Sequence, residues 1–159
     1  MLNLKKEFYL KIVFLISFIA ITSAFYLEYI LGHKPCNLCL VERIPYALSL
    51  FIILLNYKFK EKEKLLILLL ILIFTFSLII STYHFGIEQG FFEESMICKL
   101  NTASEILTKE ELLIELNKIT VSCKDVTFKI FGFSLTTLNM VLSLILIILL
   151  LKIYIYEKN

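Results

Sequence analysis

The stretch Pro35-Cys36-Asn37-Leu38-Cys39 lies between two long apolar runs and is followed at once by Glu42 and Arg43. Two residues between cysteines is a spacing at which the thiols can close a small ring, and such motifs commonly hold one reactive thiolate. The motif also immediately precedes an expected helix, whose unpaired N–H groups favour the thiolate that attacks disulfides. We therefore predict a reactive dithiol here.

The apolar runs on either side of this motif set the class of protein. Of the 159 residues, 59% are hydrophobic and only 19% are charged, and the mean hydropathy is +0.86. Four stretches are long enough, or nearly so, to cross a bilayer core, which needs about 20 apolar residues. The net charge of +2 comes from lysines at the ends of apolar runs, without a continuous basic stripe, so we expect no nucleic-acid partner. The sequence predicts an all-α membrane protein in contact with the lipid bilayer.

We expect residues 1–159 to form a single integral membrane domain, a bundle of four transmembrane helices. The first apolar run outlasts the core of an ordinary signal peptide, and no small-x-small cleavage site closes it. The uncharged run from Ile44 to Tyr57 is too short to span alone, so its helix must begin near Cys39. The expected spans are about 8–31, 40–57, 65–85 and 130–151, and the expected outward loops are 32–39 and 86–129.

The distribution of basic residues sets the expected orientation. Lysines and arginines near the ends of spans favour the cytoplasmic side. Most of them lie at the two termini and in the short loop before residue 65, whereas the loop that holds the dithiol has Lys34 and Arg43. We therefore expect both termini in the cytoplasm and all four cysteines on the opposite side of the membrane.

The segment 86–129 is the only sizeable part expected outside the membrane. Within it, Thr108-Lys109-Glu110-Glu111 is typical of a capping box that opens a short helix. Such a helix is marginal alone and needs a surface to cover its leucines at 112, 113 and 116. We expect it to lie flat on the membrane interface.

The second pair of cysteines, Cys98 and Cys123, lies in this outer segment. An even number of cysteines on one side of the membrane indicates an oxidising compartment. One interpretation is that both pairs are structural disulfides; closing the loop from Cys98 to Cys123 would stabilise the fold by roughly 3 kcal/mol. A zinc site is a weaker interpretation, because the second cysteine knuckle is missing, and we expect no metal. Redox exchange is favoured by the position of the first pair.

Three polar residues in or near the spans are further candidates. On a helix that begins near Cys39, Arg43 lies over the same face, where it can stabilise a thiolate or an oxyanion, or else reach the headgroups. His84 ends the third span at a similar depth, either as a site residue or as a hydrogen-bonding group of the interface. We expect Asn139, inside the fourth span, to hydrogen-bond between helices.

A dithiol at the boundary of lipid and water is accessible to a soluble thiol protein and to a lipid-soluble electron carrier. A protein that makes disulfides needs an electron acceptor of higher potential than the disulfide it regenerates, and a strong periplasmic oxidant lies near roughly −120 mV. Glutathione pools are too reducing for this purpose. We therefore expect a membrane quinone as the acceptor.

The chain resembles the DsbB family of quinone-dependent disulfide bond formation proteins. The matching motifs follow in order along nearly the whole chain: Pro35-Cys36-x-x-Cys39-x-x-Glu42-Arg43, Tyr83-His84-x-Gly86-x-Glu88-Gln89-Gly90, Cys98, Ser122-Cys123-x-Asp125, and Phe131-Gly132-x-Ser134 with Asn139. Their combination is far more specific than any one of them.

The resemblance implies a protein-disulfide oxidoreductase of the bacterial inner membrane with periplasmic cysteines. Such an enzyme reoxidises a thioredoxin-like dithiol oxidase of the DsbA type and passes the electrons to ubiquinone or menaquinone. The resemblance also implies that a disulfide between Cys98 and Cys123 oxidises the partner, with Cys98 as the site of the mixed disulfide. Exchange with Cys36 would then reduce the pair of Cys36 and Cys39.

In the same relay, Cys39 would face the quinone as a thiolate, with Arg43 and His84 holding the quinone oxygens. The chain departs from the family where Glu94-Ser95-Met96-Ile97 replaces a proline often found close to the first cysteine of the loop pair, a difference that concerns partner preference. Proteins of the vitamin K epoxide reductase type are also four-helix thiol and quinone enzymes. In them, however, the loop pair precedes the Cys-x-x-Cys, the reverse of the order here.

Overall fold

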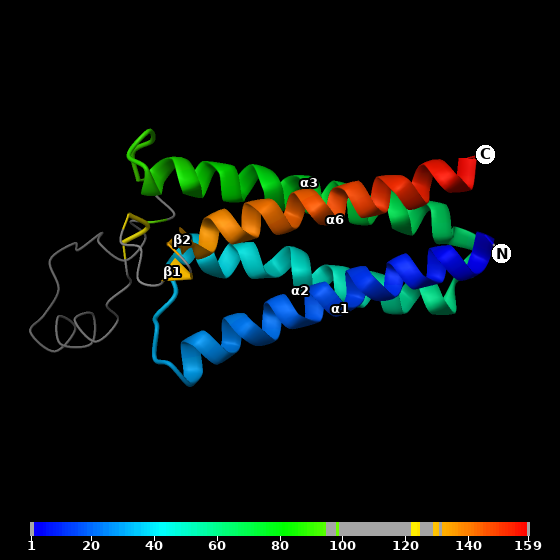
Figure 1. Cartoon of the computed structure of the whole chain (residues 1–159), viewed down its shortest axis with the longest axis horizontal. Coiled ribbons are helices and arrows are strands. Elements are labelled where there is room, and N and C mark those ends of the chain that lie inside the picture. The colour runs from blue at the N-terminus through cyan, green and yellow to red at the C-terminus, as the bar shows by residue number, and fades with distance from the viewer. Residues whose placement is uncertain (1, 95–97, 99–121, 125–128, 131, 159) are drawn as a thin grey trace, which may run out of the picture.

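Four long helices lie side by side in the computed structural model of the chain (Figure 1). The structure describes residues 2–94, 98, 122–124, 129–130 and 132–158. The long helices are α1 (Leu2–Tyr29), α2 (Asn37–Lys58), α3 (Glu63–Glu88) and α6 (Leu135–Lys158). A 3-10 turn, η1 (Lys60–Lys62), joins α2 to α3, and an antiparallel hairpin of β1 (Lys129–Ile130) and β2 (Phe133–Ser134) precedes α6.

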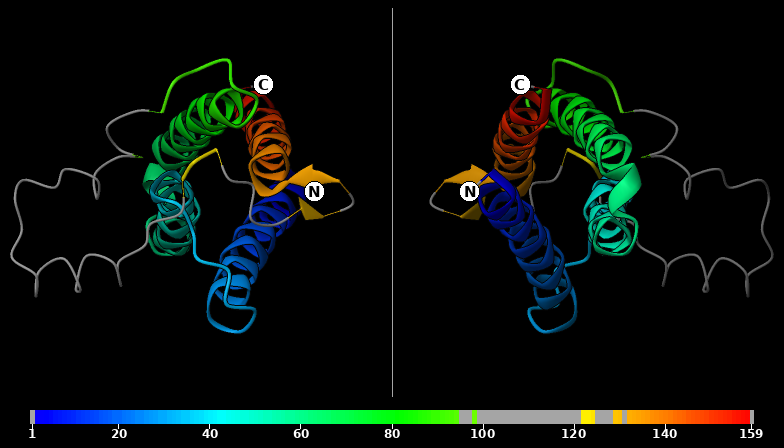
Figure 2. Two further views of the ribbon diagram at one scale, coloured as in Figure 1. Left: turned by 90° about the vertical axis from the view of Figure 1, so that its left-hand side faces the viewer. Right: turned by 90° about the vertical axis from the view of Figure 1, so that its right-hand side faces the viewer.

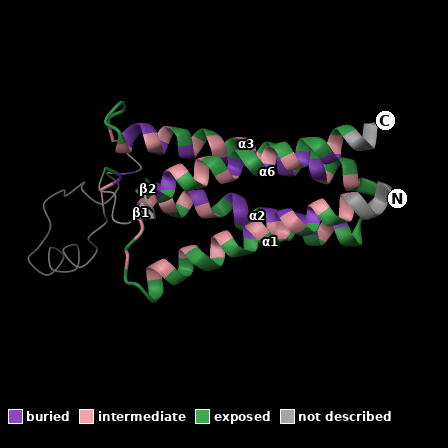
Figure 3. Ribbon diagram, in the orientation of Figure 1, coloured by how far each residue is buried: buried purple, intermediate pink, exposed green. Residues whose placement is uncertain are grey.

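All four helices are long and apolar enough to cross a membrane, with mean hydropathies of 2.1, 2.0, 2.9 and 2.5 in chain order. Their outward faces carry large exposed side chains, for example Leu15, Phe51, Leu72 and Ile148, each more than half exposed. Figure 3 shows this exposed surface along the outside of the bundle. A lipid environment covers such side chains at no cost, so the fold confirms the expected four-helix membrane bundle.

The inner faces of the helices combine large apolar side chains with small hydroxyl side chains. Phe74 on α3 is fully buried in the main apolar core. Near it, the Ser49 hydroxyl donates to Ser17 over 2.9 Å, and the hydroxyls of Ser77 and Ser143 lie 3.0 Å apart. Small polar residues allow transmembrane helices to approach closely and hydrogen-bond across the interface. These contacts tie α1 to α2 and α3 to α6.

The two ends of the bundle hold different parts of the chain. Both chain termini lie at one end, and the turn before α2 lies at the other end, together with the hairpin (Figure 1). Toward this second end, α1 diverges from α6, as Figure 2 shows in views along the bundle. A cavity lined by residues of α1, α2 and α6, among them Cys39, lies on this side of the bundle.

Two helix starts differ from the sequence-based expectation, and both differences come from local caps. Helix α2 begins at Asn37 because Cys36 is its N-cap, with the Cys36 sulfur accepting from the Cys39 backbone N–H at 3.2 Å. Helix α6 begins at Leu135, beyond the expected Ile130. There the chain first turns through the hairpin at Gly132, which has φ of 86°, and Ser134 then caps the helix by accepting from the Thr137 N–H at 3.2 Å. The helix expected over residues 108–116 lies outside the described residues.

The end of α3 has a defined shape that places its last turn. Gly90 has φ of 77°, its N–H donates to the Ile87 carbonyl, and the Phe91 N–H donates to the Gly86 carbonyl at 2.8 Å. These two bonds form a Schellman motif, which favours glycine at the left-handed position. The Phe92 ring then packs directly on Gly86, where a Cβ atom would lie 2.2 Å from the ring. A side chain at position 86 would therefore displace the Phe92 ring from the last turn of α3.

Candidate redox site

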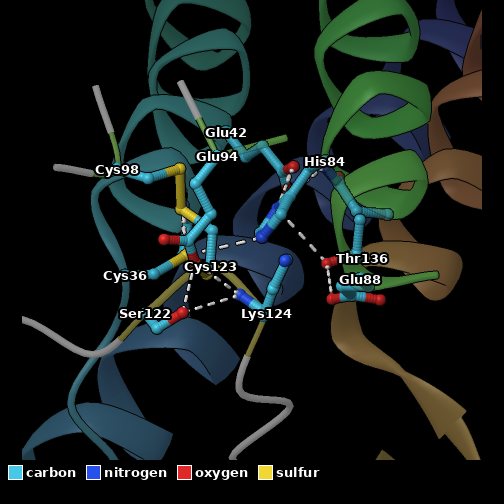
Figure 4. The surroundings of a disulfide bond; sticks show 12 residues. Cys36, Glu42, His84, Glu88, Glu94, Cys98, Ser122, Cys123, Lys124 and Thr136 are labelled. Carbon is cyan, nitrogen blue, oxygen red and sulfur yellow. Dashed lines mark hydrogen bonds and ion pairs between the residues drawn. A yellow bond between two sulfur atoms is a disulfide. The ribbon is translucent and has the colours of Figure 1, made fainter. Parts of the chain in front are cut away.

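The four cysteines form two disulfides, Cys36–Cys39 and Cys98–Cys123, whose Cα atoms lie 5.1 and 5.9 Å apart. Both disulfides belong to one buried apolar cluster that also contains Ile87 of α3. Cys36, Cys98 and Cys123 are all less than a tenth exposed. Figure 4 shows Cys36 beside the second disulfide. The fold therefore brings together two cysteine pairs that lie far apart in the sequence, as exchange between them requires.

The turn that carries Cys123 is anchored by Glu94, which follows the fold-back over α3. The Glu94 carboxylate accepts hydrogen bonds from the Ser122 hydroxyl and, at 3.3 Å, from the Lys124 N–H. Ser122 in turn accepts from the same N–H at 3.2 Å. These bonds hold the residues on both sides of Cys123 against the segment after α3 (Figure 4).

His84 lies between Cys36 and Glu42, with only 2% of its surface exposed. Its Nε2 is 3.6 Å from the Cys36 sulfur, and its Nδ1 is 2.9 Å from Oε1 of Glu42 (Figure 4). The Thr136 hydroxyl lies 3.3 Å from the same Nδ1 and donates its proton to Glu88 at 2.5 Å. The Glu42 carboxylate can only accept a hydrogen bond, and the Thr136 hydroxyl already donates its proton to Glu88. Both groups therefore accept from Nδ1, which carries a proton. In the neutral ring, the Nε2 lone pair therefore points at the Cys36 sulfur.

Glu42 connects three helices through its buried carboxylate. One oxygen faces His84 of α3, and the other accepts from the Asn139 amide of α6 at 2.9 Å. The Asn139 amide also donates to Ser81 at 2.8 Å, and its oxygen accepts from the Tyr46 hydroxyl. These bonds confirm the expectation that Asn139 hydrogen-bonds between helices.

Arg43 points toward α1 rather than toward His84. Its guanidinium forms an ion pair with Glu28 and lies over the Phe25 ring, 5.4 Å from the ring centroid. Both partners come from the last two turns of α1. Arg43 is thus held by an ion pair and a cation–π contact, a combination that suits arginine better than lysine.

A cavity of about 610 Å³ lies between α1, α2 and α6. Its walls are mostly apolar side chains of α1 and α6, such as Ile16, Ala20 and Leu142. Its polar lining includes Cys39, Glu42 and Arg43 from one face of the first turns of α2. His84 does not line the cavity, whereas Glu42 and Thr136, which both contact its Nδ1, do. The structure thus brings Arg43, but not His84, to the cavity that Cys39 faces.

Comparison with known proteins gives the family of the chain. Residues 6–153 match the family model described as disulfide bond formation protein DsbB. The chain belongs to the DsbB family. Membership in the DsbB family supports the interpretation of the chain as a disulfide-forming membrane oxidoreductase. A similar protein, uncharacterized protein RP370 of Rickettsia prowazekii (strain Madrid E), is 33% identical over 150 residues, which cover 91% of this chain and 85% of the relative. No solved structure gives a significant match.

Some partners in this DsbB-family site were not identified from the sequence. Glu28 as the partner of Arg43, and Thr136 as a partner of His84, lie on other helices and follow no local spacing. Glu42 stood in a matching motif, and an acidic residue one turn after Cys39 in an apolar helix is itself a signal for a buried partner. Its partner could be found only in the folded chain.

Proposed function

We propose that this DsbB-family protein reoxidises a periplasmic thioredoxin-like dithiol oxidase of the DsbA type and passes the electrons to a membrane quinone. The observation that carries the proposal is the two-sided environment of the first disulfide. Cys36 lies in the buried cluster with the second disulfide, whereas Cys39 lines the cavity between α1, α2 and α6. A disulfide with this arrangement can receive electrons on one side and release them on the other.

The proposed relay balances at each step. A thiolate of the partner attacks the Cys98 sulfur and displaces Cys123; the second partner thiol then resolves the mixed disulfide, so that the partner is oxidised and the loop pair is left as two thiols. One loop thiolate then attacks the Cys36 sulfur and displaces Cys39, and the second loop thiolate displaces Cys36 in turn, which re-forms the loop disulfide and leaves Cys36 and Cys39 as two thiols. A quinone supplies the final oxidation, because it takes up two electrons and two protons and leaves as the quinol.

His84 and Glu42 are suited to handle the proton of Cys36. The Nε2 lone pair faces the Cys36 sulfur at 3.6 Å, so it can take the proton of the reduced Cys36 thiol, whose thiolate re-forms the disulfide with Cys39 during quinone reduction. The opposite ring nitrogen donates to Glu42 at 2.9 Å, and Glu42 also lines the cavity. We assign His84 this role in place of a contact with the quinone, since its ring does not reach the cavity lining.

The cavity residues fit a quinone headgroup. A volume of about 610 Å³ lies within the range of about 300–1,000 Å³ that is usual for small-molecule sites. Arg43 would hold a quinone oxygen through its guanidinium N–H groups, and Cys39 would be the thiolate at the ring. The apolar side chains of α1 and α6 would pack against the rest of the quinone ring, which is largely apolar. Both ubiquinone and menaquinone satisfy these requirements.

The proposed location is the bacterial inner membrane, with both termini in the cytoplasm and the cysteines on the periplasmic side. Two observations support it. The termini lie together at the end of the bundle opposite the first disulfide (Figure 1). The lysines of the 3-10 turn, at 60 and 62, lie in the loop between α2 and α3, on the side that the positive-inside rule assigns to the cytoplasm.

The proposal is tested with the full-length protein in detergent, a reduced partner of the DsbA type and a soluble short-chain quinone. We expect one quinol for each partner disulfide formed, measured by quinone absorbance and by maleimide labelling of the remaining partner thiols. Cys36→Ser should stop quinone reduction, and Cys98→Ser should stop partner oxidation. A partner that lacks its second cysteine should accumulate a mixed disulfide with Cys98 of the intact chain, because its resolving thiol is missing. If the partner stays reduced while all four cysteines are intact, the proposal is wrong. Purely structural disulfides would give that result.

A further inference from the structure

Three metal-binding side chains converge at the start of α2. The sulfurs of Cys36 and Cys39 and a ring nitrogen of His84 all lie within 4.8 Å of one another. Only the first two are close in sequence, because His84 comes from α3, 48 residues after Cys36. The sequence has no second cysteine knuckle that would supply further zinc ligands close to the first. In the folded chain a third ligand is present.

The separations agree with tetrahedral zinc geometry. Zn–S bonds of about 2.3 Å and Zn–N bonds of about 2.0–2.1 Å place sulfur and nitrogen ligands about 3.6 Å apart in a tetrahedron. The Cys36 sulfur and the His84 Nε2 are 3.6 Å apart. The two cysteine Cα atoms, 5.1 Å apart, belong to the Cys-x-x-Cys spacing that zinc knuckles also use. Little movement other than separation of the two sulfurs is needed to admit the ion.

His84 is already oriented as a metal ligand. Its Nδ1 proton is directed at the Glu42 carboxylate at 2.9 Å, which leaves the Nε2 lone pair directed at the Cys36 sulfur, with the Cys39 sulfur within 4.8 Å of a ring nitrogen. Zinc-bound histidines almost always donate their second ring N–H to a carboxylate, a carbonyl or water, and this contact fixes the tautomer and raises the basicity of the ligand. Glu42 is in turn held by Asn139 at 2.9 Å. A pre-oriented ring of this kind costs little to use as a ligand.

We propose that the reduced form of Cys36 and Cys39, together with His84, binds one Zn²⁺ ion. Binding converts two thiols into two zinc-bound thiolates and releases two protons, so no electron is transferred. The two thiolate charges cancel the charge of the ion, which reduces the cost of holding it in a buried site. The oxidised form has no thiolate to offer and does not bind. Zinc thus acts on the state that follows partner oxidation and precedes quinone reduction.

The consequence is reversible inhibition by zinc, and this consequence rests on the proposed function. Both thiols are withdrawn from exchange while the ion is bound, so turnover should stop and should resume when a chelator removes the ion. Zinc binding itself is measured without quinone or partner. A failed turnover assay would therefore not affect the result for zinc binding. Failure to bind zinc would likewise not affect the proposed turnover.

The test uses the full-length Cys98→Ser/Cys123→Ser protein in detergent, which removes the thiols of the loop pair. Zn²⁺ affinity is measured under anaerobic conditions by competition with a chromogenic chelator. We expect one ion per reduced chain and none per oxidised chain. His84→Gln should weaken binding by at least about 100-fold, and Glu42→Gln by about 10- to 100-fold, the range seen for residues that support a ligand. His33→Gln changes the other histidine of the chain, in the turn before α2, and should alter affinity less than about 2-fold.

A second measurement does not use the His84 and Glu42 variants. X-ray absorption at the zinc edge of the reduced double variant reports the ligands directly, and thiolate-to-cobalt charge transfer with Co²⁺ in the same chain reports the thiolates. We expect two sulfurs at about 2.3 Å and one imidazole nitrogen at about 2.0–2.1 Å. Equal binding by oxidised and reduced chains, or a zinc shell without imidazole, would overturn the proposal.

Discussion

Replacing Glu42 by glutamine should disturb both the stability of the bundle and the reactivity of Cys36. Glu42 is 8% exposed, and its carboxylate accepts two hydrogen bonds of 2.9 Å, from His84 and from Asn139. Glutamine has nearly the same shape, but one of its two terminal groups is a donor. The amide must therefore face one of two donors, and each choice has a different cost.

If the glutamine amide faces Asn139, two N–H donors meet in a buried place. An unsatisfied buried donor costs about 1–3 kcal/mol, so the free energy of unfolding should fall by about 2 kcal/mol. For a chain of this length, that loss corresponds to a fall in melting temperature on the order of 5 °C. If the amide instead faces His84, the ring must accept at Nδ1 and carry its proton on Nε2. The lone pair that faces Cys36 is then lost, and Cys36 should react at least about 10-fold more slowly.

Two assays on the reduced protein in detergent separate these outcomes. Circular dichroism gives the melting temperature, and mass spectrometry of iodoacetamide-treated protein gives the alkylation rate of Cys36, which follows its thiolate content. Glu93→Gln, at an exposed acid after α3, is the matched control. The reasoning is refuted if Glu42→Gln matches this control in both melting temperature and alkylation rate.

Three further outcomes follow from the described contacts. Arg43→Met should raise the KM for a soluble quinone by about 10- to 100-fold, from the loss of a charge-assisted hydrogen bond, with Arg43→Lys intermediate; an unchanged KM would separate Arg43 from quinone binding. Gly86→Ala should lower the free energy of unfolding by about 1–3 kcal/mol, because its Cβ would lie 2.2 Å from the Phe92 ring, and the additional change Phe92→Ala should recover part of the loss. In a chain whose native cysteines are replaced, an impermeant maleimide applied to intact cells should label Lys34→Cys but not Lys62→Cys; labelling of Lys62→Cys alone would reverse the proposed orientation.

The membrane class and the number of long helices could be predicted from the sequence, because they depend on length and hydropathy alone. A span needs about 20 apolar residues whatever its neighbours are, and the four long apolar helices of the structure confirm the prediction. Helix starts were less predictable. Ile130 reads as the start of an apolar run, but Gly132 and Ser134 form a hairpin and a cap before α6, and this local geometry outweighs hydropathy.

The candidate site, too, could be predicted from the sequence only in part. The Cys-x-x-Cys motif and the basic residue one turn later could be read from spacing, since both act within a single helix start. The environment of His84 could not be read, because its distance from Cys36 and Glu42 depends on how α3 packs against α2. The sequence alone determined a four-helix membrane protein with a dithiol at one helix start. Tertiary packing decided that Cys36 faces His84 and Cys39 faces the cavity, since contacts between helices join residues that no local spacing relates.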